Sequence, residues 1–138
     1  MSLLFVFGTL KSGFPLHDRT LGGVDKLCDC RTVERFPMLV AGPWFAPIML
    51  NEPGTGHRVQ GELYDVDPER LALIDRLESV PKPGNLRLLI DVEKADGRTV
   101  LAFAYMKSAV MAQPAHTELL DRYSDDRFVP FEAREPER

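Results

Sequence analysis

Near its centre the chain reads Val59-Gln60-Gly61-Glu62-Leu63-Tyr64-Asp65-Val66, and Asp67-Pro68-Glu69 follows at once. The first segment is rich in apolar, aromatic and β-branched residues, which predicts a strand. Gly61 marks a point in it where a neighbouring backbone comes close. Asp67 is a typical N-cap, Pro68 suits the first helical position, and Glu69 suits the positive end of a helix dipole. The sequence therefore predicts a strand that passes directly into a helix.

The most informative residue of this helix is Glu78. At 100° per residue, Leu71, Ile74 and Leu77 form one apolar stripe, and Glu78 projects within it. A carboxylate there leaves bulk water and lies at the negative end of the helix dipole, and both effects raise its pKa. A raised carboxyl pKa suits a general acid or base that works near neutral pH.

The alternative is a structural role, in which Glu78 turns to solvent or pairs with Arg76 or Arg87. Helix geometry alone favours this alternative, because perturbed carboxylates are often structural. Asp75 lies off the apolar stripe, so we expect it on a solvated face.

A second candidate site lies near the N-terminus, where the apolar run Leu3 to Phe7 predicts a strand covered on both faces. Gly8 ends this run and is followed by Thr9 and Leu10. A glycine at such a place lets successive N–H groups point into one space, which makes a small nest for a carboxylate or an oxyanion. The alternative is a plain turn.

The other segments predict a single α+β domain over residues 1–138. Short apolar stretches at 38–41 and 48–50 and a half-buried alternating stretch at 86–92 indicate strands, and Asp96-Gly97 turns the chain into a further strand at 99–106. Residues 15–27 are weakly helical at best, and residues 115–123 predict a short helix. Residues 132–138 form a charged surface tail.

Composition excludes several classes of protein. The chain has 138 residues, 44% of them hydrophobic, and a net charge of −4, which excludes disorder and coiled coil as descriptions of the whole. No apolar run is long enough for a membrane span, and the N-terminus lacks the features of a signal peptide. The slight acidity argues against a nucleic-acid partner. We therefore expect a cytoplasmic protein that binds neither membranes nor nucleic acid.

Metal, cofactor and nucleophile motifs are absent from the sequence. Cys28 and Cys30 are too close for a relaxed disulfide and lack zinc-site spacing, and the three histidines are scattered. The usual nucleophile motifs and glycine-rich phosphate loops are missing as well. We expect no metal and no cofactor, so the chemistry of an enzyme would depend on carboxylates and backbone groups.

In combination these segments resemble the gamma-glutamylcyclotransferase superfamily, and within it the gamma-glutamylaminecyclotransferases of the AIG2-like group. The resemblance covers most of the chain in order, with weaker similarity at 128–138. Its main stretches are Val6-Phe7-Gly8-Thr9-Leu10-Lys11, Arg35-Phe36-Pro37-Met38-Leu39-Val40-Ala41-Gly42, and Pro53-Gly54-Thr55-Gly56 through residues 59–67 to Ile74-Asp75-Arg76-Leu77-Glu78-Ser79.

The resemblance implies a mixed, curled β-sheet or partial barrel of about five to seven strands with a few flanking helices. It also implies that Glu78 is the catalytic glutamate, which reverses the balance set by helix geometry alone. The substrate-binding loop falls on Phe7, Gly8, Thr9 and Leu10. The implied enzyme converts a γ-glutamyl amine or amide to 5-oxoproline and releases the free amine, without a metal.

Two departures from the family pattern concern the pocket wall. Phe7 stands where the family usually has tyrosine. After the helix the family commonly has a tyrosine two residues before an arginine, and here Asn85 stands at that position before Arg87. The alternative function is a non-catalytic module that binds a γ-glutamyl or carboxylate ligand on the same scaffold. A third hypothesis, an interaction domain, rests on Trp44-Phe45, for which core packing is favoured. The leaving amine stays open, and a monomer is favoured.

Overall fold

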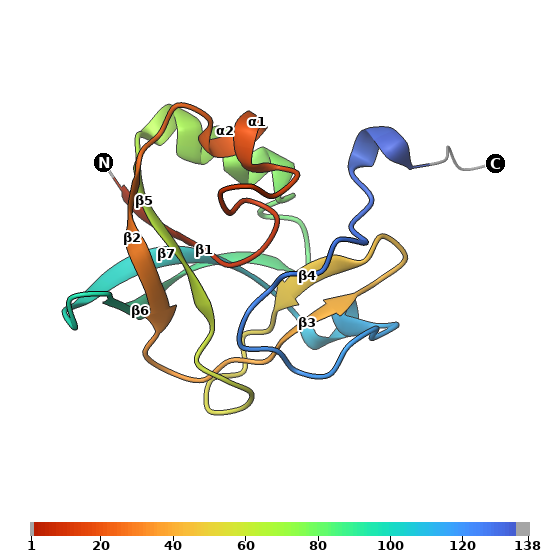
Figure 1. Cartoon of the computed structure of the whole chain (residues 1–138). Coiled ribbons are helices and arrows are strands. Elements are labelled where there is room, and N and C mark those ends of the chain that lie inside the picture. The colour runs from red at the N-terminus through yellow and green to blue at the C-terminus, as the bar shows by residue number, and fades with distance from the viewer. Residues whose placement is uncertain (1, 135–138) are drawn as a thin grey trace.

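The computed structural model of the chain describes residues 2–134. Its main sheet is a closed barrel with the strand order β1-β5-β2-β6-β7 (Figure 1). The strands are β1 (Ser2–Val6), β2 (Lys26–Thr32), β5 (Gln60–Val66), β6 (Asn85–Lys94) and β7 (Thr99–Lys107). The predicted α+β class with a mixed, curled sheet is confirmed, and the barrel is closed rather than partial.

Strand β1 closes the barrel and is covered on both faces, as its apolar sequence predicted. It pairs antiparallel with β5 and meets β7 in parallel at Leu4 and Phe103. Leu4 and Val6 pack against the helices, whereas Phe5 belongs to a second cluster of buried residues. A side chain at Gly61 would overlap the Val6 carbonyl and the Phe5 ring, so the predicted close approach at this glycine is confirmed.

Helix α2 (Pro68–Leu77) begins as its sequence predicted, because the Arg70 N–H donates to the Asp67 carboxylate at 2.8 Å. Leu71 and Ile74 are buried, but Leu77 is 47% exposed, so its predicted place in the apolar stripe is wrong. Leu77 is the last residue of α2 and, at 100° per residue, lies about 120° around the helix from Leu71, at the edge of the stripe. Glu78 is the C-cap residue that follows.

The hairpin of β3 (Met38–Ala41) and β4 (Ala46–Met49) forms a separate two-stranded sheet beside the barrel (Figure 1). The predicted helix at 115–123 is wrong, because this segment runs along β3. Its His116 N–H donates to Val40 O at 2.9 Å, and its Leu120 N–H donates to Met38 O at 2.7 Å. The edge of β3 thus satisfies backbone groups that a helix would have paired internally.

Strand β2 was not foreseen, because only two of its side chains, Cys30 and Thr32, are buried. The short helix α1 (His17–Leu21) precedes it and lies beside α2 at one end of the barrel (Figure 1). Short 3₁₀ helices, η1 and η2, follow at Ala109–Ala112 and Phe131–Ala133.

The C-terminal segment covers the loop between β3 and β4. The Phe45 ring stacks on His116 with ring centroids 4.1 Å apart, and the Arg134 guanidinium lies 4.9 Å from the centre of the Trp44 ring. Both aromatic residues are half-buried, and Phe45 packs against the main cluster of buried residues, so the core packing predicted for the pair is confirmed only for Phe45. In the predicted tail Glu132 pairs with Arg19, and residues 135–138 lie outside the described residues.

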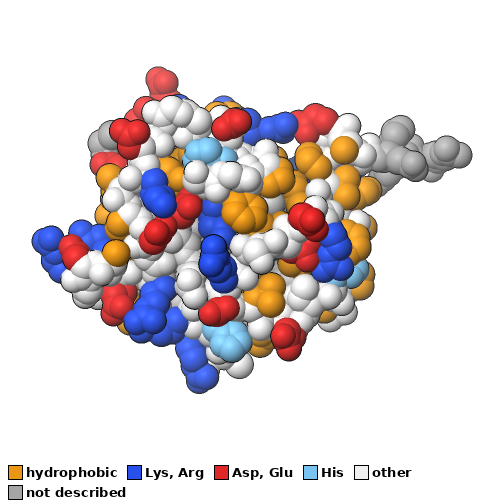
Figure 2. Space-filling model, viewed as in Figure 1, with side chains coloured by type: hydrophobic (Ala, Val, Ile, Leu, Met, Phe, Trp, Pro, Cys, Tyr) orange, Lys and Arg blue, Asp and Glu red, His pale blue; other side chains and the backbone are white. Residues whose placement is uncertain are grey.

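Among residues 2–134 the structure has no helix with the length and apolar character needed to cross a membrane. Acidic and basic side chains are interspersed over the face of the molecule drawn in Figure 2.

Candidate active site

A cavity at one end of the barrel brings together residues that are distant in the sequence. It contains about 400 Å³ of empty space, part of it open to solvent. The candidate loop and Glu78 both line it, as do one strand of the separate hairpin and the end of β7. Its lining residues are Phe5, Val6, Phe7, Gly8, Thr9, Leu10, Pro47, Ile48, Met49, Glu78, Tyr105 and Lys107.

The loop after β1 turns tightly, because the Lys11 N–H donates to Gly8 O at 3.0 Å. A Cβ at Gly8 would lie 2.6 Å from Pro47 Cγ, so β4 approaches the loop as closely as a glycine allows. Within residues 2–134, the Thr9 and Leu10 N–H groups donate to no backbone carbonyl. These amides are therefore available to a ligand oxygen, as a nest requires.

Lys11 fixes this loop to the C-terminal segment. Its ammonium is buried and donates to Tyr123 O at 2.8 Å, and it lies 4.7 Å from the centre of the Phe14 ring. Burial lowers the pKa of Lys11. The loop is thus held from both sides, by β4 and by the segment that carries Tyr123.

Glu78 caps the C-terminal end of α2, where its N–H donates to Ile74 O at 2.8 Å. Its side chain is 22% exposed, and its Oε2 atom lies 3.9 Å from Lys107 Nζ. Burial raises the pKa of Glu78, as predicted, and the positive charge of Lys107 opposes this shift. In the alternative structural role, Glu78 would turn to solvent or pair with Arg76 or Arg87, but Arg87 pairs with Asp75 at 2.6 Å and the cation near Glu78 is Lys107.

Lys107 is a functional candidate that the sequence reasoning missed, and its partner is Asn85, which the sequence analysis had noted only as a departure from the family pattern. Lys107 Nζ donates to Asn85 Oδ1 at 2.6 Å, and Asn85 Nδ2 donates to Ser79 O at 3.4 Å. Burial lowers the pKa of Lys107, and Glu78 opposes this shift. The sequence contained a signal for this pair. Counting residues outward from the predicted Asp96-Gly97 turn places Asn85 opposite Lys107 on the neighbouring strand.

Asp75 also has a role that the sequence did not predict, since it is half-buried rather than solvated. The Tyr105 hydroxyl donates to its Oδ1 at 2.7 Å, and Arg87 donates to its Oδ2 at 2.6 Å. Burial and the hydrogen bond to Asp75 raise the pKa of Tyr105, so its hydroxyl stays protonated. Asp75 therefore orients a tyrosine of the cavity wall.

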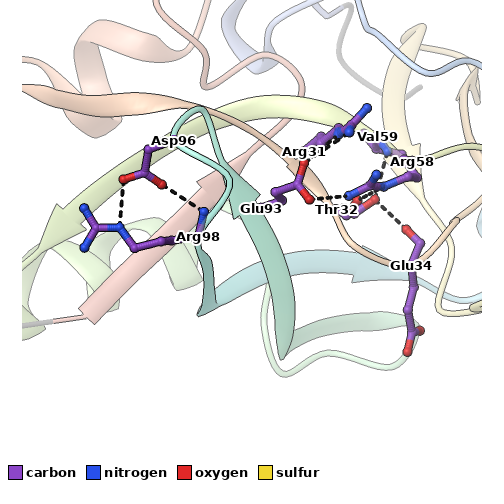
Figure 3. A network of polar contacts seen from close by, with 8 residues as sticks. All are labelled: Arg31, Thr32, Glu34, Arg58, Val59, Glu93, Asp96 and Arg98. Atoms are coloured by element: carbon purple, nitrogen blue, oxygen red, sulfur yellow. Dashed lines mark hydrogen bonds and ion pairs between the residues drawn. The ribbon is translucent and has the colours of Figure 1, made fainter.

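A second charged cluster lies on the outside of the barrel and shares no residue with the cavity (Figure 3). Glu93 of β6 accepts a hydrogen bond from Arg31 at 3.1 Å and lies 3.4 Å from Arg58. The Arg58 Nε–H donates to Thr32 O at 2.9 Å. The hydrogen bond from Arg31 lowers the pKa of Glu93.

Within residues 2–134, no group of three or more His, Cys, Asp or Glu side chains is arranged to hold a metal ion. Cys28 and Cys30 are free thiols, and burial raises the pKa of Cys30 to about 12.

Together the closed barrel, the shielded carboxylate and the free loop amides are typical of a small enzyme that performs acid–base chemistry on a bound small molecule. Residues 4–127 match the family described as Gamma-glutamyl cyclotransferase, AIG2-like. The chain belongs to this family. The predicted family and the predicted class of enzyme, a γ-glutamyl cyclotransferase, are thereby confirmed.

Individual relatives agree with this assignment. The chain is 41% identical over 153 residues to human gamma-glutamylaminecyclotransferase, covering 97% of this chain and 100% of the relative. It is 38% identical over 115 residues to gamma-glutamylaminecyclotransferase B of Danio rerio, covering 78% of this chain but only 60% of that protein. A crystal structure of an AIG2-like protein from Mus musculus superposes with a TM-score of 0.83 at 31% identity, covering 97% of this chain and 99% of that one.

Proposed function

We propose that this protein converts a γ-glutamyl amine to 5-oxoproline and the free amine, with Glu78 as the proton carrier. One observation carries the proposal: the Glu78 carboxylate lines the same cavity as the available amides of the loop Phe7–Leu10. The names of the relatives, which are those of enzymes, favour catalysis over a non-catalytic binding module.

The reaction needs no protein nucleophile, because the substrate carries its own. Glu78 accepts a proton from the substrate α-ammonium, and the free amine attacks the γ-carbonyl carbon. The bond from that carbon to the leaving nitrogen breaks, and Glu78 returns the proton to the departing nitrogen. The attacking nitrogen loses a second proton as the lactam forms, and Glu78 passes that proton on in the same way, so the amine leaves as an ammonium. Ring closure within one molecule reaches effective molarities of about 10⁵–10⁸ M when the groups are well oriented. The enzyme's task is therefore to fold the substrate and to move protons from the attacking nitrogen to the leaving nitrogen.

The raised pKa of Glu78 suits both halves of this proton transfer, because a carboxyl group that titrates nearer to neutrality is a better base and still a competent acid. The Gly8–Leu10 amides would hold the substrate α-carboxylate and orient the γ-carbonyl. Tyr105, kept protonated beside Asp75, offers the cavity a hydroxyl, although Phe7 does not.

The leaving amine lies beyond the reacting half of the substrate. The β4 wall of Pro47, Ile48 and Met49 is apolar, so it favours an alkyl chain next to the scissile bond. We further propose a cytoplasmic, single-domain monomer that acts on small molecules. We also propose that it binds no nucleic acid, which is supported by its net charge of −4 and by the interspersed charges in Figure 2.

The test is to incubate the protein with γ-glutamyl amides that carry different leaving amines and to measure 5-oxoproline by chromatography. We expect release from at least one of them and a loss on the order of 10²–10⁴-fold in Glu78→Gln. The matched control is Glu93→Gln, which removes a carboxylate outside the cavity and leaves turnover unchanged. If Glu78→Gln turns over as the wild type does, the assignment of the base is wrong. A ligand that binds without being consumed would support the binding module.

A further inference from the structure

The cavity carries one full charge of each sign. Of the described residues that line it, Lys107 is the only lysine or arginine and Glu78 is the only aspartate or glutamate. Their charged atoms lie 3.9 Å apart. An ammonium and a carboxylate on the same α-carbon have their charged atoms separated by a similar distance, about 3 Å. The pair therefore matches an α-amino-acid zwitterion in sign and in spacing.

We propose that Lys107, held by Asn85, binds the free α-carboxylate of the substrate and makes the enzyme selective for γ-glutamyl compounds whose α-amine and α-carboxylate are both charged. This inference rests on the proposed function and names the substrate class of that site. The α-ammonium lies against Glu78. The α-carboxylate lies between the loop amides, which give it neutral hydrogen bonds, and Lys107, which adds the opposite charge.

The hydrogen bonds of Lys107 leave it able to take a ligand. A lysine ammonium has three N–H donors, and Asn85 Oδ1 accepts one of them at 2.6 Å. Asn85 is itself buried and fixed, since its N–H donates to Lys82 O at 3.0 Å and its side chain donates to Ser79 O at 3.4 Å. The asparagine thus sets the position of the ammonium without neutralising its charge.

The proposed proton transfer makes a carboxylate at Lys107 useful during the reaction. When Glu78 accepts the proton of the α-ammonium, it becomes neutral and Lys107 loses its counter-charge. A partly buried ammonium without a partner is costly. The substrate carboxylate supplies that partner, so the net charge of the site stays balanced while the ring closes.

The test compares two ligands that differ only in this carboxylate, 5-oxoproline and 5-oxoprolinamide, by isothermal titration calorimetry. A charge-assisted hydrogen bond predicts that the wild type prefers the acid on the order of 10- to 100-fold. Lys107→Met should lose most of this preference, and Lys107→Arg should retain part of it. The matched control, Lys82→Met, removes an exposed charge from the neighbouring turn and should leave the preference intact.

A wild type that binds the two ligands equally, or binds neither, overturns the inference. So does a Lys107→Met protein that still prefers the acid. If Lys107 served only as the counter-ion of Glu78, the variant would change both affinities by the same factor. Should Lys107→Met fail to fold, Asn85→Ala keeps the lysine but releases it, and a smaller loss of preference is expected; an undiminished preference there contradicts the role of Asn85.

Turnover separates this inference from the proposed function. The wild type should cyclise a γ-glutamyl amine on the order of 10- to 100-fold more efficiently than the same compound with its α-carboxylate converted to a carboxamide. If no γ-glutamyl amine is cyclised but 5-oxoproline is still preferred over its amide through Lys107, the proposed function fails and the ligand assignment stands. Equal turnover of acid and carboxamide supports the proposed function and refutes the role of Lys107.

Discussion

The cavity and the outer face of the barrel each contain a glutamate beside a cation, and their pKa values move in opposite directions. Glu93 is 32% exposed and accepts a hydrogen bond from Arg31, which lowers its pKa. Glu78 is 22% exposed and lies 3.9 Å from Lys107, and burial raises its pKa in spite of that charge.

Desolvation at Glu78 and hydrogen bonding at Glu93 explain this difference. The oxygens of Glu93 receive guanidinium hydrogen bonds, which stabilise the ionised form. Lys107 donates instead to Asn85 and meets Glu78 at a longer distance, so the desolvation of Glu78 outweighs the attraction. One glutamate is thus fixed in its charged form, and the other is left able to exchange a proton.

The largest effect on activity is expected from a substitution that displaces the cavity wall around Glu78. In Gly8→Ala the new Cβ would lie 2.6 Å from Pro47 Cγ, so the loop and β4 must separate. A displacement of about 1 Å costs on the order of 10²-fold in rate, and overpacking costs about 1–3 kcal/mol of stability. Steady-state kinetics and thermal unfolding measure the two effects. Ser12→Ala, at an exposed position in the same loop, is the control; a Gly8→Ala enzyme of full activity would contradict the close fit.

A second prediction concerns the pH dependence of activity, which should report the raised pKa of Glu78. Because the pKa of Glu78 is raised from 4.5, the acid limb of kcat/KM should lie above pH 4.5, and activity should rise as Glu78 ionises. Since Lys107 lowers the pKa of Glu78, Lys107→Met should move this limb to still higher pH. Lys82→Met should not move it. A limb that stays in place or moves to lower pH in Lys107→Met would show that the two charges are not coupled.

The smallest effect is expected at Glu93. Its pKa is lowered from 4.5, so the folded state binds its proton less readily than the unfolded state does. Ionised Glu93 therefore stabilises the fold above pH 4.5, and this contribution is lost as the pH falls through the lowered value. Glu93→Gln should lower the melting temperature slightly at neutral pH, and less so in high salt. A difference from the wild type that persists in acid would have another cause.

The sequence predicted those parts of the molecule in which local chemistry and packing agree. The cap at Asp67 and the apolar run of β1 each had a local signal, and Glu78 had both a helical position and a family resemblance. Strand β2 had no such signal, because most of its side chains face solvent. The segment at 115–123 was misread as a helix, because its hydrogen-bond partners lie on β3, far away in the sequence.

The site was predicted less completely than the fold. Leu77 was placed in the stripe by its helical spacing, whereas its side chain, at the edge of the stripe in the last helical residue, is exposed. Asn85 and Lys107 belong to the site because they pair across two strands and Lys107 lies beside Glu78. Asp75 belongs to it because it accepts a hydrogen bond from Tyr105. Such contacts depend on tertiary register, which no local pattern of residues specifies.

The order of the strands also affects how the enzyme matures on the ribosome. The loop after β1 is synthesised before β7, but the barrel closes only when β1 meets β7, and Lys107 is the last residue of that strand. A nascent chain therefore carries the loop, and later Glu78, long before it has a cavity. Because the pairing of distant strands is slow, the site forms only after β7 has been synthesised. A truncated translation product has no cavity to bind a γ-glutamyl compound.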